Sequence, residues 1–267
     1  MGADIKKLRT RIKSVNSTLH LTKAMELVAS SKIRKANLAM QTGREYEKAV
    51  QETVDQLTIS PECLKSPYMQ KREVSRESII CIAGDRGLAG GYNANVFRLA
   101  KEYPDAEILP IGKRACDRFS KPGVLVESFT FSDAKKMADT LCQAFAEGKT
   151  DRVGIISTAY VSMMSQEAKI RWILPLERKE NVSSKNMIFE PDERSVLDAA
   201  IPEYVAAVLI AAVRESFASE VAARRVAMDS AGKNAQEMIE ELGIAYNRAR
   251  QGAITQEITE IVAGSDV

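Results

Sequence analysis

The sequence of 267 residues has few of the side chains on which metal sites and nucleophilic active sites depend. It contains one histidine, His20, and its four cysteines, at positions 63, 81, 116 and 142, form no C-x-x-C pair. No Cys, Asp or Glu stands at ligand spacing from His20, and a single histidine on a predicted helix leaves no Ser-His or Cys-His pair. We therefore expect no metal, no cofactor and no catalytic residue in this chain, and cysteines that stay unpaired in a reducing compartment.

Proline is absent from both ends of the chain. All eight prolines lie between the terminal segments, at positions 61, 67, 104, 110, 122, 175, 191 and 202. Because a proline in a helix interior costs about 3 kcal/mol, this distribution predicts an uninterrupted helix at each end and a compact middle. We expect the first helix to begin near Asp4 and to end before Pro61, and the last helix to take Pro202 in its first turn.

Long apolar runs are missing as well. The longest run near the C-terminal helix, residues 205–213, has nine residues, whereas a membrane span needs about twenty. The first residues contain neither an apolar signal region nor an Arg/Ser-rich transit stretch. We therefore expect a soluble protein that stays in the compartment where it is made.

The two ends do contain a repeat of apolar and small residues at alternating steps of three and four. From Ile5 to Leu57, 12 of 16 such positions are apolar, and from Ala207 to Ala263, 13 of 17 are apolar or small. Towards the C-terminus the repeat positions are 228, 231, 235, 238, 242, 245, 249 and 252. A sustained 3.5-residue repeat keeps one seam of a helix facing a partner helix. The C-terminal helix would be roughly 90 Å long, so it needs a partner of comparable length, and the N-terminal helix supplies one.

The two ends also carry opposite charge. Residues 1–58 hold 11 Lys and Arg against 6 Asp and Glu, a net +5, whereas residues 201–267 hold 6 against 10, a net −4. Opposite signs favour pairing of the two helices, although an exposed ion pair contributes only about 0 to 1 kcal/mol. The basic stretch from Lys6 to Lys13 has no interleaved aromatic residues and no recognisable binding module, so we expect no nucleic-acid binding.

The middle of the chain alternates between strand-like and helix-like segments, which predicts a mostly parallel sheet with right-handed crossovers. The expected strands are 78–83, 107–111, 124–130 and 152–157, with two more on an edge, 169–176 and 186–189. The expected helices are 94–102, 113–120 and 133–147. The predicted fold class is α/β in three parts: an N-terminal coiled-coil helix over 1–58, an α/β globular domain over 59–200, and a C-terminal coiled-coil helix over 201–267.

One glycine-dense segment, GDRGLAGGYN at residues 84–93, follows the first predicted strand and leads into a helix. Phosphate groups often bind at such a turn. The spacing here is G-x-x-G-x-x-G-G, however, whereas a dinucleotide fingerprint has G-x-G-x-x-G. The segment is either a phosphate loop or a structurally demanding tight turn, and its spacing favours the turn.

Both ends of the chain carry a resemblance to a known family, the gamma subunit of F-type ATP synthases. The closely similar segments are IKKLRTRIKSVNSTLHLTKAMELVASSKIRKA at residues 5–36 and YNRARQGAITQEITEIVAG at residues 246–264, and GDRGLAGGYN resembles that family's first strand, turn and helix. The resemblance implies a long antiparallel coiled coil of the N- and C-terminal helices, with a Rossmann-like α/β domain inserted between them that binds no nucleotide. It also implies a non-catalytic rotor shaft that couples ion-driven rotation of a membrane c-ring to ATP synthesis or hydrolysis in a hexamer of alpha and beta subunits.

The resemblance further implies partners and contact residues. By match to the family's motifs, Arg250, Gln251 and Thr255 should meet acidic or polar loops of the surrounding alpha and beta subunits, and Lys23 and Met25 should lie near a beta subunit. The alternative for each residue is an ordinary solvated or seam position of a coiled coil. The other implied partners are the epsilon and delta subunits and the c-ring, through which membrane association would be indirect.

This chain differs from some or all members of the family in a few features. The chain lacks the cysteine insertion of chloroplast members, which together with the missing transit stretch implies a bacterial protein, peripheral on the cytoplasmic side of the plasma membrane. Gly232 and Gly243 interrupt the last helix, each at a cost of about 1 kcal/mol relative to alanine.

Two other functions compete with the rotor: a coiled-coil scaffold whose α/β domain recruits a partner, and a phosphate-handling enzyme that uses the loop from Gly84 to Gly91.

Overall fold

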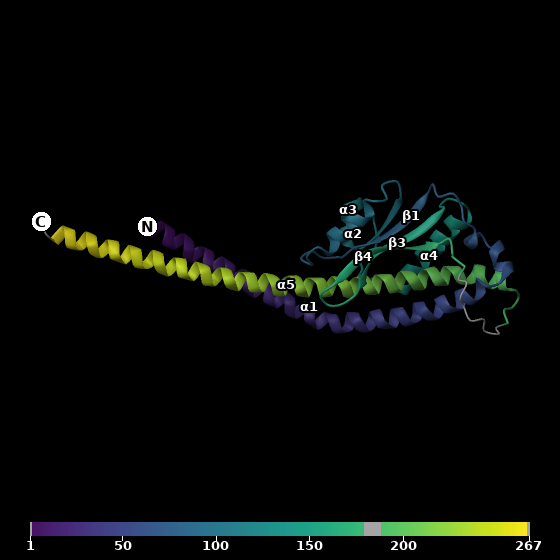
Figure 1. The fold of residues 1–267 in the computed structure, drawn as a ribbon, viewed down its shortest axis with the longest axis horizontal. Coiled ribbons are helices and arrows are strands. Elements are labelled where there is room, and N and C mark those ends of the chain that lie inside the picture. Colours follow the sequence, from purple (N-terminus) through teal and green to yellow (C-terminus); the bar gives the residue numbers. More distant parts are fainter. Residues whose placement is uncertain (1, 179–187, 266–267) are drawn as a thin grey trace. The chain divides into compact units, whose positions relative to one another are not determined.

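The computed structural model describes residues 2–178 and 188–265 (Figure 1). Two long helices, α1 (Gly2–Leu57) and α5 (Glu193–Ser265), are the first and last elements along the chain. Between them lie β1 (Glu77–Ile82), α2 (Tyr92–Ala100), β2 (Glu107–Ile111), α3 (Lys113–Phe119), α4 (Phe131–Ala146), β3 (Arg152–Tyr160) and β4 (Gln166–Leu174), with 3-10 turns at Pro61–Lys65 and Pro67–Met69. The predicted order of helix, α/β middle and helix is confirmed.

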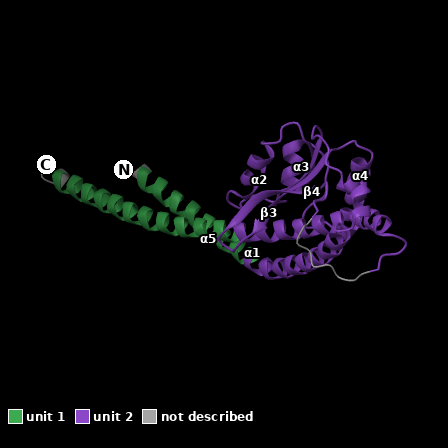
Figure 2. Ribbon diagram, turned by 45° about the vertical axis from the view of Figure 1, so that its right-hand side comes forward, with its two compact units in different colours: residues 1–29, 225–267 green, residues 30–224 purple. Residues whose placement is uncertain are grey.

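The chain divides into two compact units (Figure 2). Unit 1 comprises residues 1–29 and 225–267, and unit 2 comprises residues 30–224. Each long helix contributes one segment to each unit, so the same helix meets two different surroundings.

Unit 1 is a pair of antiparallel segments of α1 and α5 that lie side by side (Figures 1 and 2). Every predicted seam position of α1 in this unit is buried or half-buried, namely positions 5, 8, 12, 15, 19, 22, 26 and 29. The predicted seam of α5 is wrong at alternate positions. Met238 is 40% exposed, and Ala245 and Gly252 are exposed as well. The series that is buried or half-buried is 228, 232, 235, 239, 242, 246, 249 and 253.

The shift of one residue begins at Gly232, which is itself buried. A Cβ atom on Gly232 would lie 3.5 Å from Thr22 Oγ1 and 3.9 Å from Leu19 Cδ1. A Cβ atom would make ordinary van der Waals contacts here, so Gly232 faces α1 directly and takes the seam position that the heptad count assigns to Ala231. At Gly243, by contrast, no atom lies within 4 Å of the Cβ position.

Unit 2 is built on a four-stranded sheet with the order β2-β1-β3-β4. β1 pairs in parallel with β2 and β3, and β4 runs antiparallel to β3. In this register Ile80 of β1 lies opposite Leu109 of β2 and Ile155 of β3. The predicted mostly parallel sheet with an edge strand over 169–176 is thus observed, although that strand begins and ends earlier, at Gln166 and Leu174.

Side chains of β1 alternate between two cores, one on each face of the sheet. Ile80 and Ile82 join the larger core with α4 and the first part of α5, whereas Ile79 and Cys81 join the smaller core with α2 and α3. All four side chains are fully buried, as expected for a strand that is covered on both faces. α5 is therefore a core helix of unit 2, where residues 204–211 are all buried.

The start of α5 differs from the prediction. The helix begins at Glu193, so Pro202 lies inside it and not in its first turn. Asp192 holds the N-terminus, because its carboxylate accepts the N–H and the Oγ–H of Ser195 at 2.8 and 2.7 Å. Leu197, in this early part of the helix, is fully buried in the core. Packing and capping together outweigh the penalty of about 3 kcal/mol for an internal proline.

The predicted strand over 124–130 is wrong. Its N–H groups at Val126 and Glu127 donate to the carboxylate of Asp85 at 3.0 and 2.9 Å, and not to a neighbouring strand. Thr130, the last residue of this segment, then forms a capping box with Asp133 that starts α4. The predicted strand over 186–189 falls mostly outside the described residues.

Within the described residues, one helix, α5, has a stretch that could cross a membrane by length and composition alone. That stretch is 61% buried inside the protein. A core helix passes the same test, and the position of α5 in the larger core of unit 2 accounts for its apolar composition.

Candidate functional site

The loop over 84–91, which follows β1, is the candidate phosphate loop of the sequence. Its first glycine donates its N–H to Asn93 Oδ1 at 2.9 Å, and the carboxylate of Asp85 accepts an N–H from the start of α3 at 3.0 Å. Leu88 and Gly90 have φ angles of 60° and 56°, in the left-handed region, so the chain turns sharply here. The polar groups of the loop are thus engaged in holding neighbouring elements.

A carboxylate of α5 lies against this loop. Glu220 is 2% exposed, and its Oε1 accepts the N–H of Arg86 at 3.4 Å. A Cβ atom on Gly84 would lie 2.7 Å from Glu220 Cδ, so glycine is required for this close approach. A phosphate would meet a buried negative charge at this point. The contacts therefore favour the tight-turn interpretation over the phosphate loop.

Arg224 is the partner of that carboxylate. Its Nη2 lies 2.5 Å from Glu220 Oε1, and its Nε and Nη2 each donate to the carbonyl oxygen of Gly87 at 3.3 Å. Only 12% of the Arg224 side chain is exposed. Sequence reasoning missed this pair, because the heptad count treats Arg224 only as an interruption of an apolar seam. The available signal was an arginine at a seam position four residues after a glutamate.

The five residues expected to contact partner subunits lie in unit 1, in two groups. Lys23 and Met25 are on α1, where Lys23 is exposed and Met25 is half-buried. Arg250, Gln251 and Thr255 are on α5, and all three are exposed. The Thr255 hydroxyl donates to the carbonyl oxygen of Gln251 at 3.0 Å, a contact within the helix.

The pairing of the two helices shows how far apart these groups lie. Gly232 of α5 lies opposite Thr22 of α1, so it is at the same height along the helix pair as Lys23 and Met25. Arg250 lies eighteen residues further along α5, a rise of about 27 Å at helical geometry. The structure therefore does not bring the two groups together, and they mark two levels along the helix pair.

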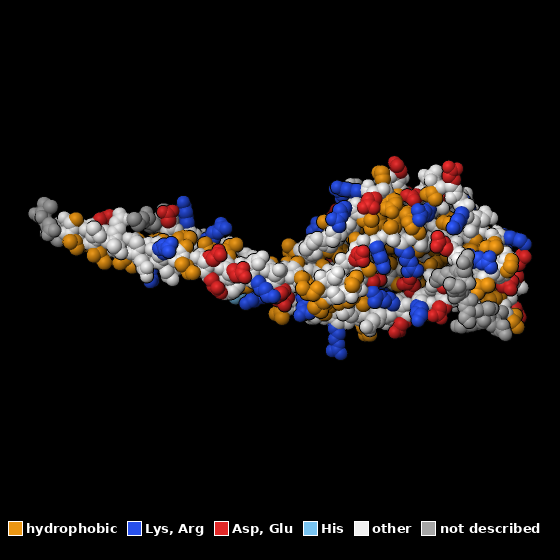
Figure 3. All heavy atoms as spheres, in the orientation of Figure 1, with side chains coloured by type: hydrophobic (Ala, Val, Ile, Leu, Met, Phe, Trp, Pro, Cys, Tyr) orange, Lys and Arg blue, Asp and Glu red, His pale blue; other side chains and the backbone are white. Residues whose placement is uncertain are grey.

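Exposed apolar side chains accompany both groups. Near the first group Leu21 and Leu27 are 65% and 69% exposed, and near the second Ile254 and Ile258 are 47% and 56% exposed. Hydrophobic side chains alternate with charged ones along the surface of this helix pair (Figure 3). Contiguous exposed apolar surface can mark a contact with another protein, whereas apolar side chains scattered singly are common on any surface.

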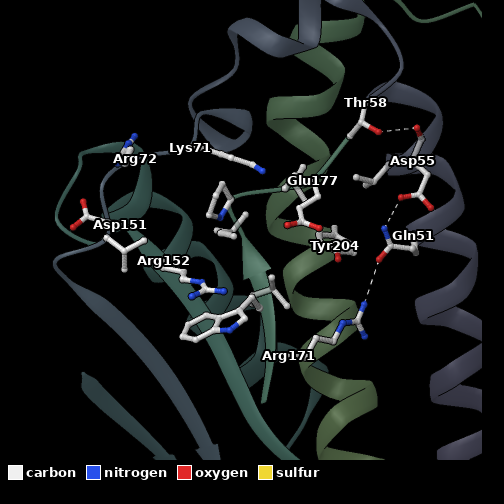
Figure 4. Close-up of a pocket in the computed structure, with 17 residues that line it drawn as sticks. Gln51, Asp55, Thr58, Lys71, Arg72, Asp151, Arg152, Arg171, Glu177 and Tyr204 are labelled. Carbon is white, nitrogen blue, oxygen red and sulfur yellow. Dashed lines mark hydrogen bonds between the residues drawn. The ribbon is translucent and has the colours of Figure 1, made fainter. Parts of the chain in front are cut away.

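A cavity of about 500 Å³ lies in unit 2, lined by α1, β4, α5 and the segment before β1 (Figure 4). Its arginines already have partners within the protein. Arg171 is paired with Glu47 and donates to Gln51 Oε1 at 3.3 Å. The guanidinium carbon of Arg152 lies 3.6 Å from the centre of the Trp172 ring. The contacts of Arg171 join α1 to β4, and the contact of Arg152 joins β3 to β4, so the side chains of the cavity wall hold these elements together.

Other charged side chains also line this cavity. Burial raises the pKa of Asp151, but hydrogen bonds from Ser75 and Arg76 outweigh this effect and hold the pKa below its usual range. The carboxylate is therefore charged at neutral pH and occupied in tying the start of β3 to the segment before β1. Lys71 and Glu177 also line the cavity (Figure 4).

The cysteines are all free thiols. Burial raises the pKa of Cys63 to about 11, and the pKa values of Cys81 and Cys142 to about 12. These thiols are protonated at neutral pH and are poor nucleophiles. Over residues 2–178 and 188–265, no group of three or more His, Cys, Asp or Glu side chains is arranged to hold a metal ion.

Comparison with known proteins points to one family. A family model described as ATP synthase matches residues 4–266. The ATP synthase gamma chain of Ruminococcus albus is 42% identical, with 98% of each chain covered. That of Alkaliphilus metalliredigens is 38% identical, and the match covers 100% of this chain and 99% of the relative. The gamma chain of Acetobacterium woodii, described as sodium ion specific, is 36% identical over the same shares.

Solved structures share the fold. A chain in the central stalk and c-ring structure of the Tetrahymena thermophila mitochondrial ATP synthase has a TM-score of 0.61 and 22% identity, and the match covers 79% of this chain and 99% of that chain. A chain in the rotor structure of the Euglena gracilis mitochondrial ATP synthase has a TM-score of 0.64 and 18% identity, covering 95% and 100%. At such identities the likeness concerns the fold.

Proposed function

Because this chain belongs to the gamma chain family of ATP synthases, we propose that it is the central-stalk rotor subunit of an F-type ATP synthase. In this role it couples ion-driven rotation of a membrane c-ring to ATP synthesis or hydrolysis in a hexamer of alpha and beta subunits. The chain itself is non-catalytic, and the active sites belong to the neighbouring subunits. The descriptions of the similar structures, as a central stalk and a rotor, support this role.

The observation that carries the proposal is the helix pair of unit 1. Its two antiparallel segments share a seam that continues on α5 from position 228 to position 253, and no proline interrupts either segment. An ion that crosses a membrane potential of about 100 mV delivers only about 2.3 kcal/mol, so several transfers must be accumulated through one shaft for each ATP. A continuous pair of helices is suited to transmit that work.

Small residues near the end of α5 support a sliding contact with the hexamer. Ala245 and Gly252 are exposed, and Ala249 and Ala253 are half-buried. Short side chains leave the outer surface of the helix with little relief, so a partner loop can pass over it through many weak contacts.

We propose that the two groups of predicted residues contact the hexamer at two levels. Lys23 and Met25 would lie near a beta subunit, whereas Arg250, Gln251 and Thr255 would meet acidic or polar loops of alpha and beta subunits. The exposure of four of these five side chains supports contact. Met25, which is half-buried, would offer only part of its side chain.

The other partners belong to the same proposal. Unit 2 would bind the epsilon subunit and the c-ring, and the delta subunit would join the same assembly. The chain would then be a peripheral protein on the cytoplasmic side of a bacterial plasma membrane, attached to it through the c-ring. Bacterial relatives at 36% to 42% identity support this location.

Reconstitution with alpha and beta subunits tests the rotor function. The chain should assemble as one copy per hexamer, counted by native mass spectrometry, and should raise ATPase turnover above that of the hexamer alone. A scaffold protein would show neither the fixed stoichiometry nor the gain in turnover. Their absence would overturn the proposal.

Titration of the isolated chain with ATP or NAD tests the enzyme alternative. The buried carboxylate of Glu220 beside the loop predicts no saturable binding at micromolar concentration. Saturable binding in calorimetry that is lost in Gly87→Ala would favour a phosphate-handling enzyme over the rotor.

A further inference from the structure

A charged contact attaches α1 to the α/β domain within unit 2. Lys32 Nζ lies 2.5 Å from Glu127 Oε1, and Arg86 Nη2, from the glycine-dense loop, lies 3.4 Å from Glu127 Oε2. The hydrogen bond from Lys32 lowers the pKa of Glu127, so this carboxylate is charged at neutral pH. The side chains of Lys32 and Glu127 are 35% and 44% exposed.

A second charged contact attaches α5 to the same loop. Arg224 is paired with Glu220 of its own helix at 2.5 Å, and it donates two hydrogen bonds to the carbonyl oxygen of Gly87 at 3.3 Å. Here the side chains are only 12% and 2% exposed. The contact on α5 is thus buried, whereas the contact on α1 is open to solvent.

One residue connects the two contacts. The carboxylate of Asp85 accepts the N–H groups of Val126 and Glu127 at 3.0 and 2.9 Å, which ties the loop to the turn that carries Glu127. Charge-assisted hydrogen bonds to a carboxylate are roughly twice as strong as neutral ones. The loop and the turn therefore form one connected body that holds both long helices.

The contacts lie where each helix reaches the limit of unit 2. Lys32 is the third residue of α1 within the unit, and Arg224 is the last residue of α5 within it. Both contacts therefore lie close to the points at which α1 and α5 leave the domain.

We propose that Lys32, Glu127 and Arg224 are positioning residues of a clamp through which the α/β domain turns both long helices together. This inference rests on the rotor function proposed above, because only a rotor has to pass torque from its domain to its helices. The clamp comprises these three residues with Arg86 and Glu220.

The physical reason lies in the difference between packing and hydrogen bonding. Apolar contacts along a helix are non-directional, so they resist separation but allow a helix to roll or slide slightly against its neighbour. Hydrogen bonds between charged groups depend on distance and angle, so they resist such rotation. The α1 contact is the more exposed one, and it should yield first under load or at high salt.

Removal of the α1 contact should leave the domain folded. Further along α1, Arg44 Nη2 lies 2.6 Å from Glu215 Oε1 of α5, and Glu47 is paired with Arg171 of β4. These pairs and the buried Val54 keep α1 attached to unit 2. Lys32→Met and Glu127→Gln therefore test the clamp and not the fold.

A rotation experiment on the reconstituted complex measures the clamp directly. The hexamer is fixed to a surface, and a bead is attached to the exposed position 118 of α3 through Arg118→Cys. The angular variance of the bead during pauses should rise about twofold in Glu127→Gln and in Lys32→Met, since an exposed pair contributes only modest stiffness. The double variant should be no worse than Glu127→Gln alone, because that change already removes the charged partner of Lys32. Glu62→Gln, which removes an exposed pair with Lys65 at 2.9 Å, is the matched control and should leave the variance unchanged.

Salt supplies a second measurement that needs no new variant. Raising the ionic strength to about 1 M shortens the screening length to about 3 Å, so the angular variance of the unaltered clamp should rise. In Glu127→Gln the same change should have no further effect, because the contact is already gone.

The outcomes separate the clamp from the rotor function. Equal angular variance in the unaltered chain and both variants, in complexes that rotate normally, would overturn the clamp alone. A chain that assembles with no hexamer, or that never rotates, would overturn the proposed function. A rise in variance in Glu62→Gln as large as in Glu127→Gln would also contradict the clamp, because it would show a general loss of stiffness.

Discussion

The two halves of α5 place one continuous helix in two different surroundings. In unit 2, residues 204–211 are all buried, and the helix joins the larger core with α1, α4 and the sheet. In unit 1 the helix is buried along one seam, and residues 254–263 are all exposed. Where a helix is surrounded on several sides, a substitution that leaves a cavity lowers its stability at most positions. Where a helix has one partner, most of its positions can be substituted with little loss of stability. Stability should therefore concentrate in unit 2, and the adaptable surface in unit 1.

The largest contrast should come from the same truncation in each unit. Leu209 of α5 is fully buried in unit 2, so Leu209→Ala should destabilise that unit by about 2 to 5 kcal/mol. Leu242 is only half-buried in unit 1, and Leu242→Ala should cost less than half as much. Denaturant unfolding monitored by hydrogen exchange in each unit checks this. Equal costs would contradict the contrast between the units.

A proline should break unit 1 without harming unit 2. Ala249→Pro removes a helix hydrogen bond and introduces a clash, at a cost of about 3 kcal/mol. Helicity around residue 249 should fall, and coupling in the reconstituted complex should be lost. Hydrogen exchange in β1 should remain as slow as in the unaltered chain. Faster exchange there would show that the two units do not unfold separately.

The two glycines of α5 offer a smaller and sharper test. A large side chain at Gly232 would meet Thr22 and Leu19, whereas the Cβ position of Gly243 is open. Gly232→Leu should therefore weaken the helix pair, and Gly243→Leu should stabilise it by about 1 kcal/mol through helix propensity. Thermal unfolding followed by circular dichroism compares the two variants. Equal shifts would contradict the placement of Gly232 in the seam.

Alanine substitutions at Arg250 and Gln251 should have the smallest effect on the fold and a large effect on function. Arg250 and Gln251 are exposed, so the double change to alanine should alter stability by less than about 0.5 kcal/mol. Assembly with the hexamer, or coupling of ATP hydrolysis to rotation, should nevertheless be impaired. The matched control is Arg248→Ala with Asn247→Ala, two exposed neighbours on the same helix. Normal ATP synthesis in the Arg250 and Gln251 variant would remove these residues from the contact surface.

Sequence reasoning succeeded where the signal was periodic and local. The α1 seam from Ile5 to Ala29 is confirmed, because the partner contacts one stripe of that helix throughout. On α5 the same method placed Met238, Ala245 and Gly252 in the seam, and each of these predictions was wrong by one residue. Successive residues of a helix are about 100° apart around its axis, so a shift of one residue turns a different face toward α1, and in the structure that face contains Gly232.

Contacts between distant parts of the chain could not be predicted in this way. The N–H groups of Val126 and Glu127 are bonded to Asp85, some forty residues earlier, which turned a strand-like sequence into a loop. The pairing of Glu220 with Arg224 has an i, i+4 spacing, but its burial depends on Gly84 of a distant loop. Likewise, the two groups of predicted contact residues were recognisable by resemblance, while their separation along the helix pair required the pairing of α1 with α5.

The sequence by itself determined that this protein has a long helix at each end, that the helices pair, and that its family is that of the ATP synthase gamma chains. The absence of proline and the heptad repeat act along one stretch of chain, so neighbouring residues are enough to reveal them. Only the tertiary structure decided the phase of the α5 seam, the start of that helix before Pro202 and the charged contacts around the glycine-dense loop. Each of these depends at least in part on contacts between distant parts of the chain, which packing in three dimensions sets and local periodicity does not encode.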